Sequence, residues 1–197
     1  MAVDRQQLMK DLRSFYDFTN KTVLFVGAGN GRLLDPTVQT RKLIAIDKDR
    51  ETLKLKVDIA AQNTLDSIEL KVSSFEAVEL SGDVVYFEFC LHEMTDPYGT
   101  LVHARYLAPE IVVFDHLPDS EWSFYAAEEE RVRRSTEAME RFGVRRCDMF
   151  HIEQRFSDHP ELHAKLMGQG TVAIERAQHF LGATGIVIPM SYQLALL

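Results

Sequence analysis

Residues 22–32 read TVLFVGAGNGR, an apolar run that passes directly into three closely spaced glycines. A short run of β-branched and other apolar residues predicts a buried strand. Glycines directly after it permit a tight turn and let the backbone approach a ligand closely. A second apolar run, LIAID at 43–47, ends in Asp47. A strand, a glycine turn and a second strand ending in an acid form the arrangement with which a parallel α/β sheet binds a nucleotide.

Strand and helix patterns alternate along the rest of the chain, which is typical of a parallel sheet covered by helices. Strands are expected at 22–26, 43–47, 68–72, 83–89, 111–117, 149–156 and 186–197. Helices are expected at 8–16, 53–61, 96–107 and 120–142, with two shorter pieces broken near Gly168 and Gly170. Asp96 followed by Pro97 is a strong helix start, because the aspartate caps the helix and proline suits its first turn.

The length and net charge of the chain limit its domain organisation and the partners that it can bind. A chain of 197 residues is most simply a single domain, residues 1–197. The formal net charge of -8 argues against a nucleic-acid partner, since a phosphate-tracking surface needs excess Lys and Arg. The two cysteines are too few for a disulfide framework and indicate a reducing compartment. With no apolar leader and no stretch long enough to cross a bilayer, we expect a cytoplasmic protein without a membrane partner.

The spacing of the glycines distinguishes between cofactors. A dinucleotide site uses G-x-G-x-x-G, whereas here Arg32 stands at the third-glycine position and Gly27, Gly29 and Gly31 form G-x-G-x-G. This pattern resembles motif I of the Rossmann-like, class I S-adenosylmethionine-dependent methyltransferases. GDVVYFEFCLHEMTDP (82–97) and ARYLAPEIVVFDH (104–116) are similar to the family's fourth-strand motif and to the helix and strand that follow. The resemblance covers about residues 15–117 and is nearest to the small-molecule methyltransferases of ubiquinone biosynthesis.

The resemblance implies an α/β fold: a doubly wound, mostly parallel seven-stranded sheet with an antiparallel last strand and helices on both faces. It also implies S-adenosylmethionine as cofactor. The glycine turn would hold the methionine part, Asp47 the ribose, Ser74 and Phe75 the adenine, and the end of the fourth strand the sulfonium. The implied cofactor-binding residues are Gly27, Ala28, Gly29, Gly31, Asp47, Lys48, Ser74, Phe75, Glu88 and Phe89.

Phe25 departs from the family pattern. An acid usually stands at this position and helps to fix the ammonium group of the cofactor, which phenylalanine cannot do. Either Glu88, at the tip of the neighbouring fourth strand, supplies the missing charge, or Phe25 is a core residue and backbone carbonyls suffice. A third hypothesis is a degenerate relative that binds the cofactor weakly.

Two histidines follow predicted strands and lie where ligands bind in open α/β sheets: His92 after the fourth and His116 at the end of the fifth. Each is a candidate general base for a hydroxyl or thiol acceptor. The alternative is that His92 caps a helix or packs in a polar turn near the substrate. His159 and His163 are spaced for one helix face, but Pro160 places His159 at the cap, so no metal site is expected.

The sequence thus predicts transfer of a methyl group to a small-molecule acceptor. The helical segment 118–146 is expected to cover the acceptor. Either this segment or a second copy of the chain has to exclude water, so a homodimer is one of two expectations. The rival hypotheses are a non-catalytic S-adenosylmethionine-binding or regulatory protein, which Phe25 favours, and an NAD-dependent oxidoreductase, which Arg32 disfavours.

Overall fold

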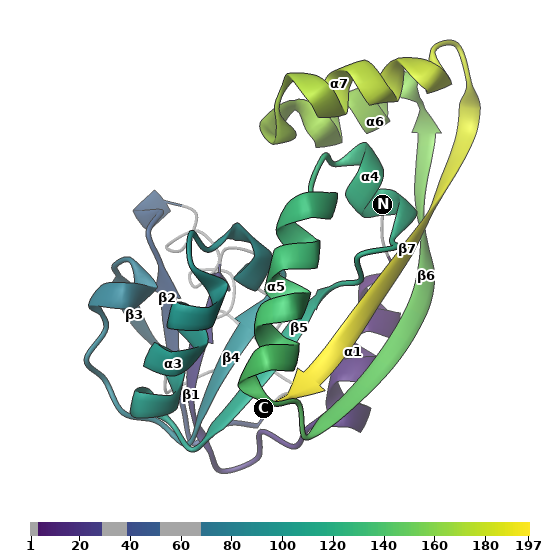
Figure 1. Ribbon diagram of the computed structural model, residues 1–197. Helices are drawn as coiled ribbons and strands as arrows, with labels where there is room; N and C mark the ends of the chain where they lie inside the picture. The colour runs from purple at the N-terminus through teal and green to yellow at the C-terminus, as the bar shows by residue number, and fades with distance from the viewer. Residues whose placement is uncertain (1–3, 29–38, 52–67) are drawn as a thin grey trace.

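The computed structural model describes residues 4–28, 39–51 and 68–197, and its framework is a seven-stranded sheet in the order β3-β2-β1-β4-β5-β7-β6 (Figure 1). The strands are β1 (Thr22–Val26), β2 (Lys42–Asp47), β3 (Ile68–Val72), β4 (Val84–Glu88), β5 (Glu110–His116), β6 (Arg146–Asp158) and β7 (Thr184–Leu196). The pairs among β1 to β5 are parallel, whereas β7 is antiparallel to both β5 and β6. The predicted doubly wound sheet with an antiparallel last strand is therefore confirmed.

Helices cover both faces of this sheet. The α-helices are α1 (Arg5–Phe15), α3 (Pro97–Leu107), α4 (Glu121–Tyr125), α5 (Glu129–Phe142), α6 (His159–Leu166) and α7 (Thr171–Ala177). Short 3₁₀ turns are η2 (Phe75–Ala77), η3 (Leu91–Glu93), η4 (Met167–Gln169) and η5 (Gln178–Phe180). In Figure 1, α3 and α5 lie in front of the sheet and α1 lies behind it.

The alternation of side chains along β1 builds two core layers. Val23 and Phe25 join the layer against α1, while Leu24 and Val26 join the layer against α3 and α5. Both sets are almost fully buried, because a central strand of a sheet covered on both faces has no solvent side. Asp96 caps α3 as predicted, since its carboxylate accepts a hydrogen bond from the Gly99 N–H at 3.0 Å.

The prediction of a single helix over 120–142 is wrong, because the structure has two helices, α4 and α5, separated by residues 126–128. Ala127 has a φ of 56°, in the left-handed region, which ends the first helix. The Glu128 N–H donates to the Ser123 carbonyl at 2.8 Å and closes this turn. As a consequence Glu128 points into the protein, with an exposed fraction of 3%. The helix expected at 53–61 lies outside the described residues.

The last two strands are longer than predicted and form an extension of the sheet. β6 begins at Arg146 and ends at Asp158, beyond the expected 149–156. β5 pairs only with residues 192–196 of β7, so the rest of β7 pairs with β6 alone. Figure 1 shows that this ribbon carries α6 and α7 at its far end.

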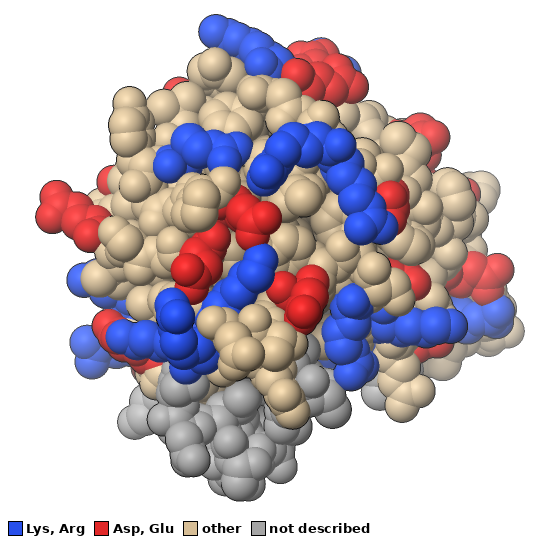
Figure 2. Space-filling model, turned by 90° about the horizontal axis from the view of Figure 1, so that it is seen from below, with Lys and Arg blue, Asp and Glu red and all other residues tan. Residues whose placement is uncertain are grey.

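Charged side chains of both signs meet at the amino ends of the parallel strands. Ion pairs here join Lys21 to Glu110 at 2.7 Å and Arg41 to Asp83 at 2.8 Å. Figure 2, which views this end of the molecule, shows Lys and Arg interspersed with Asp and Glu. Lys21 and Arg41 at this end are therefore each paired with an acid. Of the helices described, none has the length and hydropathy needed to cross a membrane.

Candidate functional site

A cleft of about 660 Å³ opens at the carboxyl ends of β1, β2, β3 and β4. This is the edge at which open parallel sheets bind ligands, and the volume lies within the usual range for a small-molecule site. Each of the four strands contributes the residues at or just beyond its end. The predicted residues Gly27, Asp47, Lys48, Ser74 and Phe75 all line it.

Gly27 begins the turn after β1, and no other residue fits its position. Its φ is +72°, and a Cβ added here would lie 2.7 Å from both Cβ and Sγ of Cys90. The Gly27 N–H donates to the Ile46 carbonyl at 3.1 Å, which ties the turn to β2. The backbone after β1 is thus held against β4 and β2, at the mouth of the cleft. Gly29 and Gly31 lie outside the described residues, and Ala28 is fully buried.

Asp47 ends β2 and borders the cleft with Lys48. Its Oδ1 accepts a hydrogen bond from the Asp49 N–H at 3.0 Å, and its carbonyl accepts one from the Ser73 N–H at 3.0 Å. These contacts fix the residue at the junction of β2 and β3. A carboxylate held in this way can accept hydrogen bonds from vicinal hydroxyls such as those of a ribose.

Ser74 and Phe75 follow β3 and form the side of the cleft. Ser74 precedes the short turn η2, in which Phe75 is the first residue. The Phe75 ring is almost buried and packs edge-on against Phe87 and His103, with centroids 5.2 Å away in each case. Phe75 therefore offers an apolar wall that is rigidly supported from behind, which suits a planar aromatic ligand.

Glu88 and Phe89 stand at the end of β4 but are not among the described residues that line the cleft. Phe89 has a φ of 47°, a strained conformation for a bulky residue. Its ring packs against Phe114 and His116, with centroids 4.6 Å away in both cases. The chain thus turns sharply after Glu88, and this turn places η3 beside the cleft.

Phe25 and Glu88 are neighbours on one face of the sheet. Phe25 is paired with Tyr86, and their ring centroids lie 5.3 Å apart. Glu88 is two residues beyond Tyr86 on β4. Its side chain therefore projects from the same face of the sheet, nearer the carboxyl edge. Phe25 is a core residue, as one of the two hypotheses holds. Glu88 is fully buried, with its carboxylate on the face that an acid at position 25 would share.

His92 lies in η3 and is clamped by Asp115 at the end of β5. Nδ1 of His92 is 2.5 Å from Oδ1 of Asp115, and the His92 backbone N–H donates to Oδ2 of Asp115 at 3.1 Å. Both side chains are buried. Burial would raise the pKa of the Asp115 carboxyl, but His92 beside it holds that pKa below its usual range.

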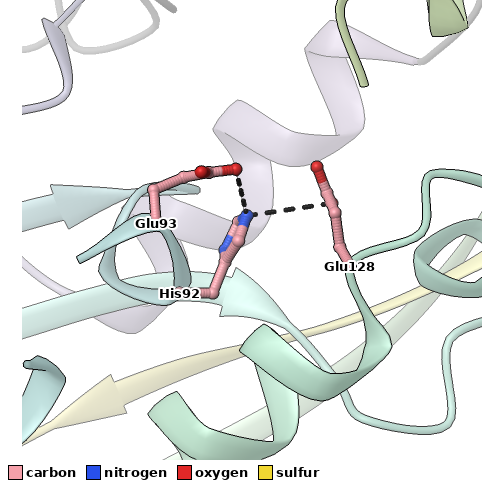
Figure 3. A group of neighbouring side chains, drawn as sticks. All are labelled: His92, Glu93 and Glu128. Atoms are coloured by element: carbon pink, nitrogen blue, oxygen red, sulfur yellow. Dashed lines mark ion pairs between the residues drawn. The ribbon is translucent and has the colours of Figure 1, made fainter. Parts of the chain in front are cut away.

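The other ring nitrogen of His92 faces two glutamates (Figure 3). Nε2 lies 3.3 Å from Oε1 of Glu93 and 3.7 Å from Oε2 of Glu128. Burial would lower the pKa of His92, but Asp115, Glu93 and Glu128 together outweigh it and raise the pKa to about 10. Carboxylates thus surround the His92 ring, and each ring nitrogen faces at least one of them.

His116 is the second candidate base, and the structure places it one residue beyond Asp115. Its ring centroid lies 5.7 Å from that of His92 and 4.6 Å from that of Phe89. It is almost buried, and it is not among the described residues that line the cleft. The two predicted histidines are therefore brought together, on the side of η3 away from the glycine turn.

Glu128 and Arg131 are part of this cluster, although the sequence pattern did not single them out. Arg131 lies 2.8 Å from Glu93 and 3.5 Å from Glu128. Glu129, the next residue along the chain, points elsewhere and pairs with Arg176 at 2.7 Å. The helix break at 126–128 decides which glutamate points inward, and a continuous helical pattern carries no signal of it.

Comparison with known proteins identifies the fold only. No family model and no curated protein matches the chain. A putative methyltransferase from Bacillus halodurans is similar over 95% of this chain and 96% of its own, with a TM-score of 0.71 and 13% identity. An S-adenosylmethionine-dependent methyltransferase from Aquifex aeolicus is similar over 98% of this chain and 89% of its own, with a TM-score of 0.61 and 18% identity.

The same fold occurs in a protein that is named for another activity. A precorrin 8W decarboxylase from Methanobacterium thermoautotrophicum is similar over 98% of this chain and 87% of its own, with a TM-score of 0.58 and 13% identity. The protein therefore has the fold of the class I S-adenosylmethionine-dependent methyltransferases. At these identities the likeness extends to the fold alone, and one fold hosts several chemistries.

Proposed function

We propose that the protein binds S-adenosylmethionine in the cleft and transfers its methyl group to a small-molecule acceptor. The observation that carries the proposal is the convergence of Gly27, Asp47 and Phe75 on one cleft at the carboxyl edge of the sheet. These residues suit the three parts of the cofactor: a glycine turn for the methionine, a carboxylate for the ribose and an apolar wall for the adenine. Bound there, the cofactor would supply a methyl group already activated by the sulfonium.

The residues that would hold the cofactor fit it chemically. The turn at Gly27 presents backbone groups rather than a side chain, because a Cβ would collide with Cys90. Asp47 would accept hydrogen bonds from the ribose hydroxyls, with Lys48 beside it. Ser74 and Phe75 would flank the adenine, and Ala28 would pack beneath the turn. Glu88, on the same sheet face as Phe25, would supply the negative charge for the ammonium group.

The chain's own contribution to the transfer is positioning of the acceptor and exclusion of water. The new bond forms from an acceptor lone pair to the methyl carbon as the bond to sulfur breaks, and the acceptor loses its proton. His92 is poorly placed to take that proton, because Asp115 lies 2.5 Å from Nδ1 and Nε2 faces Glu93 and Glu128 rather than open cleft. We therefore propose that His92 positions the acceptor at its side of the cleft. His116, whose ring packs against that of Phe89, would support the His92 ring.

The acceptor end of the cleft lies toward Glu93, Met94 and Thr95, which follow β4. Residues 118–146 would cover this region, and two contacts support this: α5 packs against α3, and Glu128 lies 3.7 Å from His92. A compact cover of this kind suits a small molecule rather than a polymer. We accordingly place the protein with the small-molecule methyltransferases, of which the ubiquinone-biosynthesis type is the nearest in motif.

The non-catalytic alternative rests on Phe25, since loss of an acid for the ammonium group is one way in which a site degenerates. A measurement of turnover distinguishes the catalytic proposal from the non-catalytic alternative. Purified protein would be incubated with S-adenosylmethionine and a panel of hydroxyl, thiol and amine acceptors, and release of S-adenosylhomocysteine measured. Acceptor-dependent release that disappears in Asp47→Asn supports the proposal. Binding of the cofactor without release for any acceptor class favours the regulatory alternative.

A further inference from the structure

The cluster that contains His92 brings together three possible metal ligands from two distant parts of the chain. His92 and Glu93 belong to η3, and Glu128 belongs to the turn between α4 and α5 (Figure 3). One ligand atom from each of the three lies within 4.8 Å of the others. Ligands that are about 2.1 Å from a tetrahedral ion lie about 3.4 Å apart. The distances of 3.3 Å and 3.7 Å from Nε2 of His92 to the glutamate oxygens are close to this spacing.

Asp115 holds the His92 ring in the orientation that a metal ligand needs. The carboxylate engages Nδ1 and the backbone N–H of His92, which leaves Nε2 directed at the two glutamates. Histidines that bind metals almost always donate the other ring N–H to a carboxylate, carbonyl or water. Asp115 is itself buried and fixed by a hydrogen bond of 2.9 Å from the His116 N–H to Oδ1.

Arg131 holds the two glutamates by their outer oxygens. Its Nη1 lies 2.8 Å from Oε2 of Glu93, and its Nη2 lies 3.5 Å from Oε1 of Glu128. The oxygens nearer His92 are the opposite ones, Oε1 of Glu93 and Oε2 of Glu128. All three ligand groups are thus oriented from outside, with one atom of each turned toward a common point.

The burial of Glu128 is a second observation that indicates a bound ligand, in addition to the spacing of the ligand atoms. Its exposed fraction is 3%, yet the ion pairs that its carboxylate makes in the described part of the chain are 3.5 Å and 3.7 Å long, longer than the roughly 2.8 Å of a charge-assisted hydrogen bond. A buried carboxylate requires close partners or a metal ion, because desolvation of the charge is costly.

We propose that Nε2 of His92, Oε1 of Glu93 and Oε2 of Glu128 form a binding site for one divalent transition-metal ion. One imidazole and two carboxylates suit Zn²⁺ or Mn²⁺ better than Mg²⁺, which prefers oxygen ligands and keeps its waters. The ion replaces the proton on Nε2, which leaves to solvent, while Nδ1–H stays on Asp115. Three protein ligands leave at least one position open, and Glu93 also lines the cleft, so this position faces the acceptor end.

The test is metal binding by the full chain, which does not depend on methyl transfer. Protein stripped with a chelator would be titrated calorimetrically with Zn²⁺, Mn²⁺ and Mg²⁺, and the bound metal counted by mass spectrometry. We expect one equivalent of Zn²⁺ or Mn²⁺ and much weaker Mg²⁺ binding. Glu128→Gln keeps the side-chain volume and is expected to lower the affinity at least about tenfold. Glu137→Gln, on the exposed face of α5, is the matched control and is expected to change nothing.

A folding defect is separated from loss of a ligand by circular dichroism and by a second variant. Asp115→Asn leaves all three ligands in place and is expected to weaken binding about tenfold to a hundredfold, because the ring loses its anchor. Wild-type protein that is folded and binds none of the ions overturns the proposal and leaves the cluster as a buried ion-pair network. Zn²⁺ or Mn²⁺ binding that is equally tight in folded Glu128→Gln also overturns it, since the ion is then bound elsewhere.

Discussion

Oδ1 of Asp115 lies 2.5 Å from Nδ1 of His92, and this contact joins the end of β5 to the turn after β4. The two strands are neighbours in the sheet, so the pair fixes how the turn leaves the carboxyl edge. Every other member of the cluster, Glu93, Glu128 and Arg131, is arranged around the ring that Asp115 orients. The position of this ring therefore determines how the cluster is arranged beside the cleft.

Replacement of Asp115 by asparagine is expected to reduce the free energy of unfolding by about 3 kcal/mol, because it removes one charge from a buried pair. Urea denaturation at neutral pH measures the change. Asp119→Asn, at an exposed position between β5 and α4, is the control and is expected to stay within about 0.5 kcal/mol of wild type. A loss below about 1 kcal/mol for Asp115→Asn would contradict the anchoring role.

Gly27→Ala is expected to destabilise the protein more than an ordinary left-handed glycine substitution. The added methyl group would lie 2.7 Å from Cys90, in addition to the strain of a φ of +72°. Gly182 has a nearly equal φ of +78°, and nothing lies within 4 Å of its added Cβ, so Gly182→Ala isolates the strain alone. We expect about 1–2 kcal/mol for Gly182→Ala and about 1–3 kcal/mol more for Gly27→Ala. If thermal or urea unfolding shows equal losses of stability for Gly27→Ala and Gly182→Ala, the close approach to Cys90 makes no contribution.

Asp47→Asn is expected to lower the affinity for S-adenosylmethionine at least about tenfold, because an ionised acceptor of two hydroxyl hydrogen bonds is lost. Glu76→Gln removes the same charge from another residue that lines the cleft and serves as the comparison. If both variants weaken binding alike, the effect is one of net charge, and the assignment of Asp47 to the ribose fails.

Glu88→Gln tests whether this carboxylate replaces the acid that Phe25 displaces. We expect about a tenfold loss of affinity for S-adenosylmethionine, since the buried carboxylate would face the ammonium group. Methylthioadenosine lacks the amino-acid part, so its affinity should not change in the same variant. Unchanged affinity for the full cofactor would rule out the charge replacement and leave backbone carbonyls as the partners of the ammonium group.

Much of this architecture follows from local patterns. The strands at 22–26 and 43–47 were predictable because buried strands of a parallel sheet are continuously apolar. The edge strand at 68–72 was predictable because its apolar and polar residues alternate. Asp96 was predictable as a helix cap because its chemistry is local. Asp47 follows from the same logic, since the ends of parallel strands meet at one edge, whereas Phe75 was expected only from the resemblance to the methyltransferases.

The cluster around His92 could not be predicted in the same way. The apolar stripe that includes Trp122, Val132 and Met139 continues at helical spacing through the break at 126–128, so the sequence showed one helix where two exist. The left-handed conformation of Ala127 is set by packing, because alanine has no intrinsic preference for it. Only that turn brings Glu128 to His92, across 36 positions of sequence. Tertiary contacts of this kind leave no periodic signal.

The most direct test of the central claim is calorimetric titration of the purified, folded protein with S-adenosylmethionine, with S-adenosylhomocysteine and NAD as comparisons. The account predicts micromolar binding of the first two, one molecule per chain, and no binding of NAD. Absence of binding by both sulfur compounds would contradict it, and Phe25 would then mark a site that has lost its cofactor.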